Sequence, residues 1–209
     1  MIVASCVILL AACSRSCGER HEGAPAPVGS ADLAALSGLR MFQHLVTPQN
    51  CQSLGFDSVE QAKRAVLAAP MLVFEIGWDR LKSFHPGDDV SRVLALTSSI
   101  IYPVAVDAQP RSGVTVVKKP EGYVPASFGN AETVCALAQI RTTNPVDVFA
   151  VFVPVLGMYF LAARTASGLM LTPALEYPDL PFRAGVAAPA ALVVQALVPL
   201  VQRYNGLPI

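Results

Sequence analysis

The sequence predicts an α+β fold in which an antiparallel sheet is packed by helices. Seven β-prone apolar runs alternate with turn-rich segments of Pro, Gly and Asp, which is the pattern of short strands in a meander. Four further stretches place apolar residues at helical spacing. The chain has 209 residues, of which 53% are hydrophobic and 14% are charged, so it is long and apolar enough to bury a substantial core.

Two helices are expected in the N-terminal half. Residues 31–46 predict only a short helix, because Gly38 interrupts the apolar pattern and glycine weakens a helix interior. Residues 57–69 predict a longer helix, because Asp57 and Glu60 form a capping box at its start and a proline follows its end.

Two more helices are expected in the C-terminal half. Asn130 is a suitable cap for a helix over residues 130–139, which bury one apolar face. Residues 189–204 begin with proline, which a helix tolerates at its first position. Pro199 lies inside this stretch and should bend the helix or end it early.

The expected strands lie between these helices. They are residues 71–76, 100–106, 112–117, 123–128, 146–153, 158–163 and 169–173. The three strands between residues 100 and 128 predict an antiparallel meander. Pro103 and Pro125 lie inside two of them, so these strands are expected at a sheet edge or at bulges.

The order of helix followed by strands occurs twice along the chain. Residues 58–60 (SVE) resemble residues 130–132 (NAE). These observations suggest a duplicated helix-plus-three-strand unit, with halves at residues 54–129 and 130–209.

Two long uncharged runs raise the question of a membrane span. Residues 148–163 contain Pro154, Gly157 and many aromatic and β-branched side chains, which favours two strands around a turn. Residues 184–201 are rich in alanine, which favours a packed helix over a span. A second membrane segment is the alternative for this last run.

The first residues contain a targeting signal. Residues 2–12 form an apolar stretch that is too short to span a bilayer and has the length of a signal-peptide core. The stretch ends in residues 10–13 (LAAC), which resemble the lipobox of bacterial lipoproteins. This resemblance implies a signal peptide at residues 1–12, cleavage before Cys13, a diacylglycerol thioether on its sulfur, and acylation, as with palmitate, of the new amino terminus.

A tether is expected after the anchor. Residues 13–29 are rich in Gly, Pro and charge and contain no large apolar residue, as in flexible spacers. Ser14 rather than Asp follows the cysteine, and the resemblance then implies sorting to the outer membrane. The chain is therefore expected in the cell envelope, facing the periplasm, with the membrane as a partner through the lipid and residues 30–209 as the globular domain.

Composition and motifs argue against several classes of function. Acidic and basic residues balance at 15 each, so no basic stripe predicts a nucleic-acid partner. The three histidines show no metal-ligand spacing. No glycine-rich nucleotide motif is present, so no cofactor is expected.

The cysteines of the processed chain could form one disulfide bond. Cys17, Cys51 and Cys135 remain beside Cys13 after processing. An oxidising periplasm permits a bond between Cys51 and Cys135, which would join the two halves. Three free or buried thiols are the alternative.

No catalytic residue is assigned from the sequence. There is no GxSxG elbow, and Cys51 with His85 as its base matches no cysteine-protease signature. The carboxylates available for acid and base catalysis are scattered without informative spacing: Glu75, Asp79, Asp88, Asp89, Asp107 and Glu176.

The leading hypothesis is an envelope lipoprotein whose domain binds a protein, a peptide or an apolar ligand. Predicted edge strands and a surplus of apolar residues favour it. One alternative is a periplasmic hydrolase, in which His44 or His85 would lie beside Cys51 or a carboxylate. The other is a purely structural envelope protein.

Overall fold

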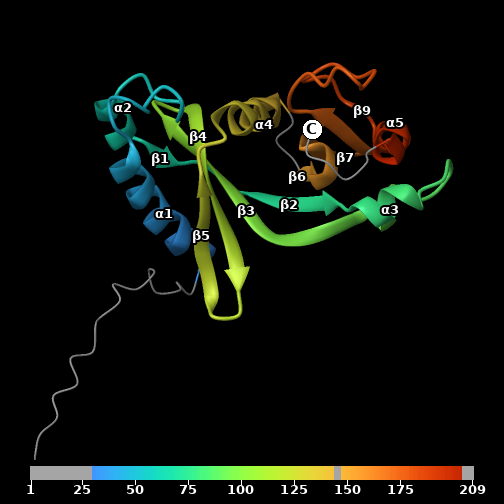
Figure 1. The fold of residues 1–209 in the computed structure, drawn as a ribbon, viewed down its shortest axis with the longest axis horizontal. Coiled ribbons are helices and arrows are strands. Elements are labelled where there is room, and N and C mark those ends of the chain that lie inside the picture. Colours follow the sequence, from blue (N-terminus) through green and yellow to red (C-terminus); the bar gives the residue numbers. More distant parts are fainter. Residues whose placement is uncertain (1–29, 144–146, 204–209) are drawn as a thin grey trace, which may run out of the picture.

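The computed structural model describes residues 30–143 and 147–203, and Figure 1 shows how their elements are arranged. The helices are α1 (Ala31–Leu45), α2 (Val59–Lys63), α3 (Trp78–Lys82), α4 (Ala131–Thr143) and α5 (Ala190–Arg203), with 3-10 turns η1 (Val90–Arg92) and η2 (Pro154–Leu156). The strands are β1 (Val66–Leu67), β2 (Met71–Ile76), β3 (Leu94–Val106), β4 (Gln109–Lys119), β5 (Gly122–Phe128), β6 (Val148–Val153), β7 (Met158–Thr165), β8 (Gly168–Pro173) and β9 (Ala188–Pro189). Helices packed on a mainly antiparallel sheet confirm the predicted α+β class.

All nine described strands belong to one sheet. Their order is β5-β4-β3-β2-β6-β7-β8-β9, with β1 as a further partner of β3. Neighbours are antiparallel except for β2 and β6, which are parallel. The described strands of the predicted halves, 54–129 and 130–209, therefore meet at this parallel pair, while their origin by duplication stays a prediction.

The two faces of the sheet are covered unequally. The face that we call the α4 face packs against α4 through Met71, Ile101, Ala150 and Leu161. The opposite face packs against α1 at its β3–β5 end and against α5 at its β6–β8 end. The α4 face is thus covered by one helix and the opposite face by two. Part of the α4 face therefore remains open.

Helix α1 is longer than the sequence predicted. It spans 15 residues, and the Ser30 side chain caps it by accepting the Leu33 N–H at 3.2 Å. Gly38 is buried in its interior, where an added Cβ would lie 2.9 Å from Val114 Cγ1 and 3.2 Å from Pro125 Cβ. The glycine that weakened the prediction therefore permits the close packing of α1 on β4 and β5, and this packing outweighs its low helix propensity.

The helix predicted at 57–69 is wrong in its length. Helix α2 ends at Lys63, and the chain then enters β1, which pairs with β3. A pairing with a strand some forty residues away thus wins over the local helical periodicity, as tertiary contacts commonly do.

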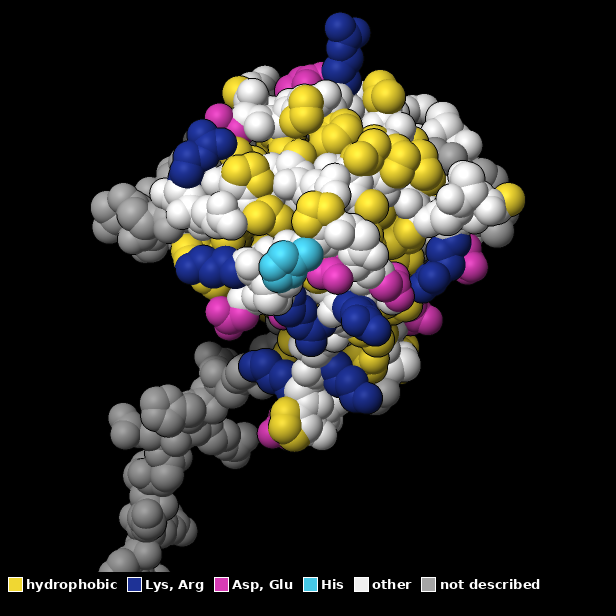
Figure 2. All heavy atoms as spheres, turned by 90° about the vertical axis from the view of Figure 1, so that its right-hand side faces the viewer, with side chains coloured by type: hydrophobic (Ala, Val, Ile, Leu, Met, Phe, Trp, Pro, Cys, Tyr) yellow, Lys and Arg dark blue, Asp and Glu magenta, His cyan; other side chains and the backbone are white. Residues whose placement is uncertain are grey.

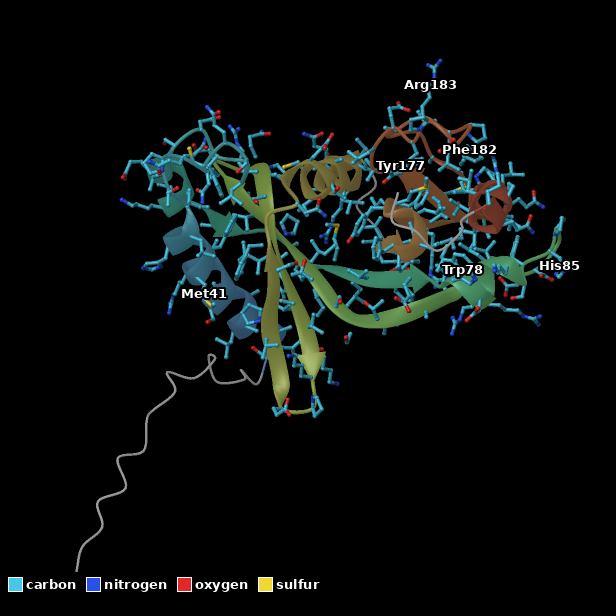
Figure 3. All side chains as sticks on the ribbon, in the orientation of Figure 1. Met41, Trp78, His85, Tyr177, Phe182 and Arg183 are labelled. Atoms are coloured by element: carbon cyan, nitrogen blue, oxygen red, sulfur yellow. The ribbon has the colours of Figure 1, made fainter. Side chains whose placement is uncertain are left out.

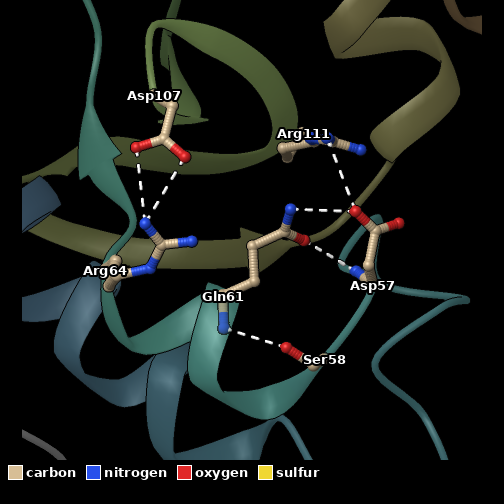
Figure 4. Close-up of polar contacts among 6 residues, drawn as sticks. All are labelled: Asp57, Ser58, Gln61, Arg64, Asp107 and Arg111. Carbon is tan, nitrogen blue, oxygen red and sulfur yellow. Dashed lines mark hydrogen bonds and ion pairs between the residues drawn. The ribbon is translucent and has the colours of Figure 1, made fainter.

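The cap of α2 is shifted by one residue from the prediction (Figure 4). Ser58 is the N-cap and accepts the Gln61 N–H, while the Gln61 side chain accepts the Asp57 N–H at 2.7 Å. Arg111 lies 3.5 Å from the Asp57 carboxylate, and Arg64 lies 3.4 Å from Asp107. These contacts fasten α2 to the β3–β4 end of the sheet.

The predicted meander is confirmed as β3, β4 and β5. Pro125 lies on β5, at the edge of the sheet and beside a register shift. Pro103 lies on an interior strand, between the segment of β3 that pairs with β1 and the segment that pairs with β2. The β1 and β2 ladders leave out this position, which is how an interior strand accommodates a proline.

The C-terminal elements follow the prediction closely. Strands β6 and β7 form from the run at residues 148–163 that raised the question of a span, and β8 follows them; residue 146 of the predicted strand lies outside the described residues. Helix α4 follows Asn130, whose carbonyl accepts the Val134 N–H at 3.0 Å. It continues to Thr143, beyond the predicted end.

Pro199 was predicted to bend the last helix or to end it early, and the early end does not occur. Helix α5 continues past Pro199 to Arg203, and Tyr204 lies outside the described residues. Pro199 is on the exposed side, while Val193, Leu197 and Val201 are buried, so packing of the apolar stripe holds the helix together across the proline. Within residues 30–143 and 147–203, no helix has the length and apolar character needed to cross a membrane.

Candidate functional site

The open part of the α4 face contains a hollow of about 360 Å³. Its floor is apolar and includes Val73 and Ile101. Its walls contain one carboxylate (Glu75), two aromatic rings (Phe152, Tyr159) and a group of hydroxyls (Thr97, Ser98, Ser99, Thr115, Ser127). We call this cavity the sheet hollow.

A β-bulge shapes the sheet hollow. Leu72 pairs with Ile100, but two residues later Phe74 pairs with Leu96, so β3 has two extra residues opposite β2. The Thr97 hydroxyl fills the gap in the ladder, donating to the Val73 carbonyl at 2.7 Å and accepting the Ser99 N–H at 3.0 Å. Bulges bend the strand that contains them, and Figure 1 shows β3 as a long strand that curves toward α3.

Three side chains of the sheet hollow form a row across three strands. Glu75 on β2 is paired with Phe152 on β6, which is paired with Tyr159 on β7. Paired residues point to the same face of a sheet. The rings of Phe152 and Tyr159 are stacked, with centroids 4.4 Å apart.

The hydroxyl group of Tyr177 holds the backbone of Tyr159 in place. The Tyr159 N–H donates to the Tyr177 hydroxyl at 2.7 Å, and this hydroxyl donates to the Tyr159 carbonyl at 3.2 Å. Burial raises the pKa of the Tyr159 phenol and also that of Tyr177. Both phenols therefore stay neutral at physiological pH.

The charge of the sheet hollow is negative. Glu75 is half-buried, and within the described residues its carboxylate forms no hydrogen bond or ion pair. No Lys, Arg or His is among the described residues that line the cavity. The hollow thus offers a single carboxylate, hydroxyl groups and aromatic surface, which are the usual parts of a small-ligand site.

A second cavity lies beside the C-terminal part of α4. Its volume is about 300 Å³, and its walls are mainly small apolar side chains (Ala68, Ala69, Pro103, Ala105, Ala108, Pro110, Ala138), together with Arg141 and Thr142. Arg141 Nη1 donates to the Ala69 and Pro70 carbonyls at 2.7 and 2.9 Å. An apolar ligand, as considered from the sequence, fits the chemistry of this cavity better than that of the sheet hollow.

The cysteines nominated for a disulfide are both free thiols in the structure. Cys51 is buried in the loop after α1, where its sulfur lies 3.7 Å from the Pro48 carbonyl oxygen. Cys135 is half-buried on α4, and burial raises the pKa of its thiol, with Arg111 acting in the opposite direction. Cys13, the predicted lipidation site, lies outside the described residues.

Most of the groups considered for a hydrolase lie apart, and His85 and Asp88 are the exception. His44 binds the Arg40 carbonyl of its own helix at 2.7 Å. His85 lies beyond α3, at the end of the molecule opposite to α1 (Figure 3). Its backbone N–H donates to the Asp88 carboxylate at 2.8 Å, and its imidazole Nδ1 lies 3.8 Å from the same carboxylate. Among the described residues, no contact joins either imidazole to Cys51, and no group of three His, Cys, Asp or Glu residues is placed to hold a metal ion.

Sequence reasoning named only one residue of the sheet hollow as a functional candidate. Glu75 was among the scattered carboxylates, and it stands out as the charged residue of the apolar strand 71–76. Phe152 and Tyr159 belong to an apolar run, so their side chains were expected in the hydrophobic core. Thr97 to Ser99 come before residue 100, where the strand was predicted to begin. An isolated charge in an apolar strand was the one available signal.

The side of the molecule formed by α3 and α5 has a different character (Figure 2). Hydrophobic side chains gather over its upper part, and a group of Lys and Arg side chains lies below them. Val186 and Leu192 are the large hydrophobic residues exposed near α5. This side also contains a hollow of about 220 Å³ beside α3 and η1, which is lined by Arg80, Ser83, Phe84, Asp88, Asp89, Arg92 and Val93.

Comparisons with protein families, curated proteins and solved structures give no match to this chain.

Proposed function

We propose that this chain is a membrane-tethered lipoprotein of the bacterial cell envelope, and that its periplasm-facing domain binds a small polar ligand in the sheet hollow. The tether proposal is supported by residues 10–13 (LAAC), which follow an apolar stretch of signal-peptide length. It is also supported by the Gly- and Pro-rich composition up to residue 29. The expected location is the outer membrane, because Ser14 follows the cysteine.

The observation that supports ligand binding best is the unpartnered Glu75 carboxylate. It is half-buried in a sheet whose neighbouring side chains are apolar, aromatic or hydroxyl groups. Partial burial of a charge without a partner is unfavourable. A strand position that needs only stability would be filled by an apolar or neutral residue, so a charge at this place favours a role toward a ligand.

The tether is tested by replacing Cys13 with Ala. We expect the Cys13→Ala variant to incorporate no labelled palmitate and to remain an uncleaved precursor, because only a thiol forms the thioether that precedes cleavage. The measurement is palmitate labelling followed by gel mobility. Cys17→Ala is the matched control and should be labelled and cleaved like the wild type. Equal labelling of the two variants would overturn the lipoprotein proposal.

Ligand binding is tested by blocking the sheet hollow at its rim. Ser127 is exposed on β5 and lines the hollow, whereas its exposed neighbour Ala126 does not. The full-length lipoprotein in nonionic detergent is heated with lysine, glutamate, glucose or glycerol, since a ligand that binds the folded state raises the unfolding temperature. We expect at least one compound to raise it, and we expect Ser127→Tyr to abolish this rise.

Ala126→Tyr adds the same bulk outside the hollow and should keep the rise. If no compound raises the unfolding temperature, or if both tyrosine variants respond like the wild type, the proposal of a ligand site in the hollow fails.

A further inference from the structure

We infer that the sheet hollow is a site for a primary ammonium group on an organic cation. This inference rests on the proposed function, since it names the chemistry of the ligand for the same cavity. Three features of the hollow support it: the charge, the aromatic pair and the hydroxyl acceptors.

The charge of the hollow selects a cation. Glu75 is the one charged residue among the described residues of the lining, and no basic side chain neutralises it. A half-buried carboxylate is screened less by water and salt than an exposed one. An anionic ligand would be repelled, and a neutral ligand would leave the carboxylate without a counter-charge.

The aromatic pair is placed to share the cation with Glu75. Phe152 is the direct cross-strand neighbour of Glu75, and the Tyr159 ring stacks on it at 4.4 Å. The faces of aromatic rings attract cations, and they do so more strongly where water is partly excluded. A carboxylate beside aromatic rings is therefore suited to an alkylammonium, whose carbon chain also packs on the rings.

The hydroxyls match the donors of an ammonium group. Such a group has three N–H donors and no acceptor. One donor is expected at Glu75, and the hydroxyl oxygens of Ser98 and Ser99 on the neighbouring strand β3, which accept no hydrogen bond from the described residues, are available for the others. The hollow has only one carboxylate, whereas Ca²⁺ and Mg²⁺ sites usually present several oxygen ligands. These features favour an organic ammonium over a metal ion.

The test compares two probes of nearly equal shape and different charge. Full-length lipoprotein, labelled with ¹⁵N and dissolved in nonionic detergent, is titrated with n-pentylammonium chloride and separately with 1-pentanol. Backbone amide shifts of residues 97–99, Phe152 and Tyr159 are followed by NMR. We expect these amides to shift with pentylammonium, and we expect an affinity for 1-pentanol that is at least tenfold lower.

Two variants locate the effect. Glu75→Gln keeps the size of the side chain and removes its charge, so it should lower the affinity for pentylammonium to about that for pentanol. Glu121→Gln removes a charge from the exposed β4–β5 turn and should leave the affinity unchanged. If Glu75→Gln fails to fold, as judged by loss of amide dispersion, the two probes on the wild type decide alone.

The failure of this inference differs from the failure of the proposed function. Equal affinity for both probes, or full retention of pentylammonium binding in Glu75→Gln, overturns the ammonium site. The proposed function still stands in that case if a neutral or anionic compound binds in a way that Ser127→Tyr abolishes. The absence of any ligand that Ser127→Tyr displaces overturns both.

Discussion

The turn between β3 and β4 shows how a single residue can store strain. Val106 pairs with Gln109, so Asp107 and Ala108 form a two-residue turn, with φ angles of 50° and 64°. This left-handed pair is the geometry of a tight hairpin turn in which Gly or Asn is favoured. Aspartate tolerates the conformation, but alanine does so at a cost in free energy.

Replacing Ala108 with Gly should therefore stabilise the protein. We expect Ala108→Gly to raise the free energy of unfolding by about 0.5–1 kcal/mol, because relief of the left-handed strain exceeds the entropy that glycine adds to the unfolded chain. The shift is measured as the midpoint of urea denaturation.

The control for this change is Ala166→Gly. Ala166 is also exposed in a hairpin turn, but it does not have a positive φ, so glycine should not stabilise there. Equal stabilisation by both glycines would contradict the strain argument.

At the scale of the element, α5 shows that tertiary packing determines whether a helical pattern in the sequence forms the helix that it predicts. Its apolar stripe was visible in the sequence, and the structure buries it against the sheet. The early end that was one of the two effects predicted for Pro199 does not occur, and the sequence did not show that this residue faces solvent. The same holds for α2, where pairing of β1 with β3 shortens a helix that local periodicity predicted.

The stripe of α5 makes a quantitative prediction. Leu197 is fully buried, so Leu197→Ala should lower the free energy of unfolding by about 2–5 kcal/mol through lost burial and a residual cavity. Leu192 is on the same helix and is 51% exposed, so Leu192→Ala should cost less than about 0.5 kcal/mol.

The measurement is chemical denaturation of both variants beside the wild type. Similar stabilities of Leu197→Ala and Leu192→Ala would mean that α5 does not pack on the sheet as described.

At the scale of the whole molecule, local patterns predicted the elements but not their assembly. Alternating and helical patterns gave most strands and helices, because they depend on a few consecutive residues. The parallel pairing of β2 with β6 joins Val73 to Ala150, and no local pattern indicates such a partner. The sheet hollow depends on that pairing, since it brings Glu75 next to Phe152. The charge of the site was therefore visible in the sequence, while its aromatic half was hidden among core residues.

The central position of the β2–β6 pair has a consequence for the nascent chain. A chain that emerges with its amino terminus first completes β1 to β5 before β6 exists. During this interval, β2 exposes the backbone groups of residues 73–75 that later pair with residues 150–152. An unpaired edge beside apolar side chains is a template for aggregation with another chain. The half-made sheet therefore has an edge open to pairing with another chain, whereas the finished sheet ends in β5, which contains Pro125, and in the two-residue β9.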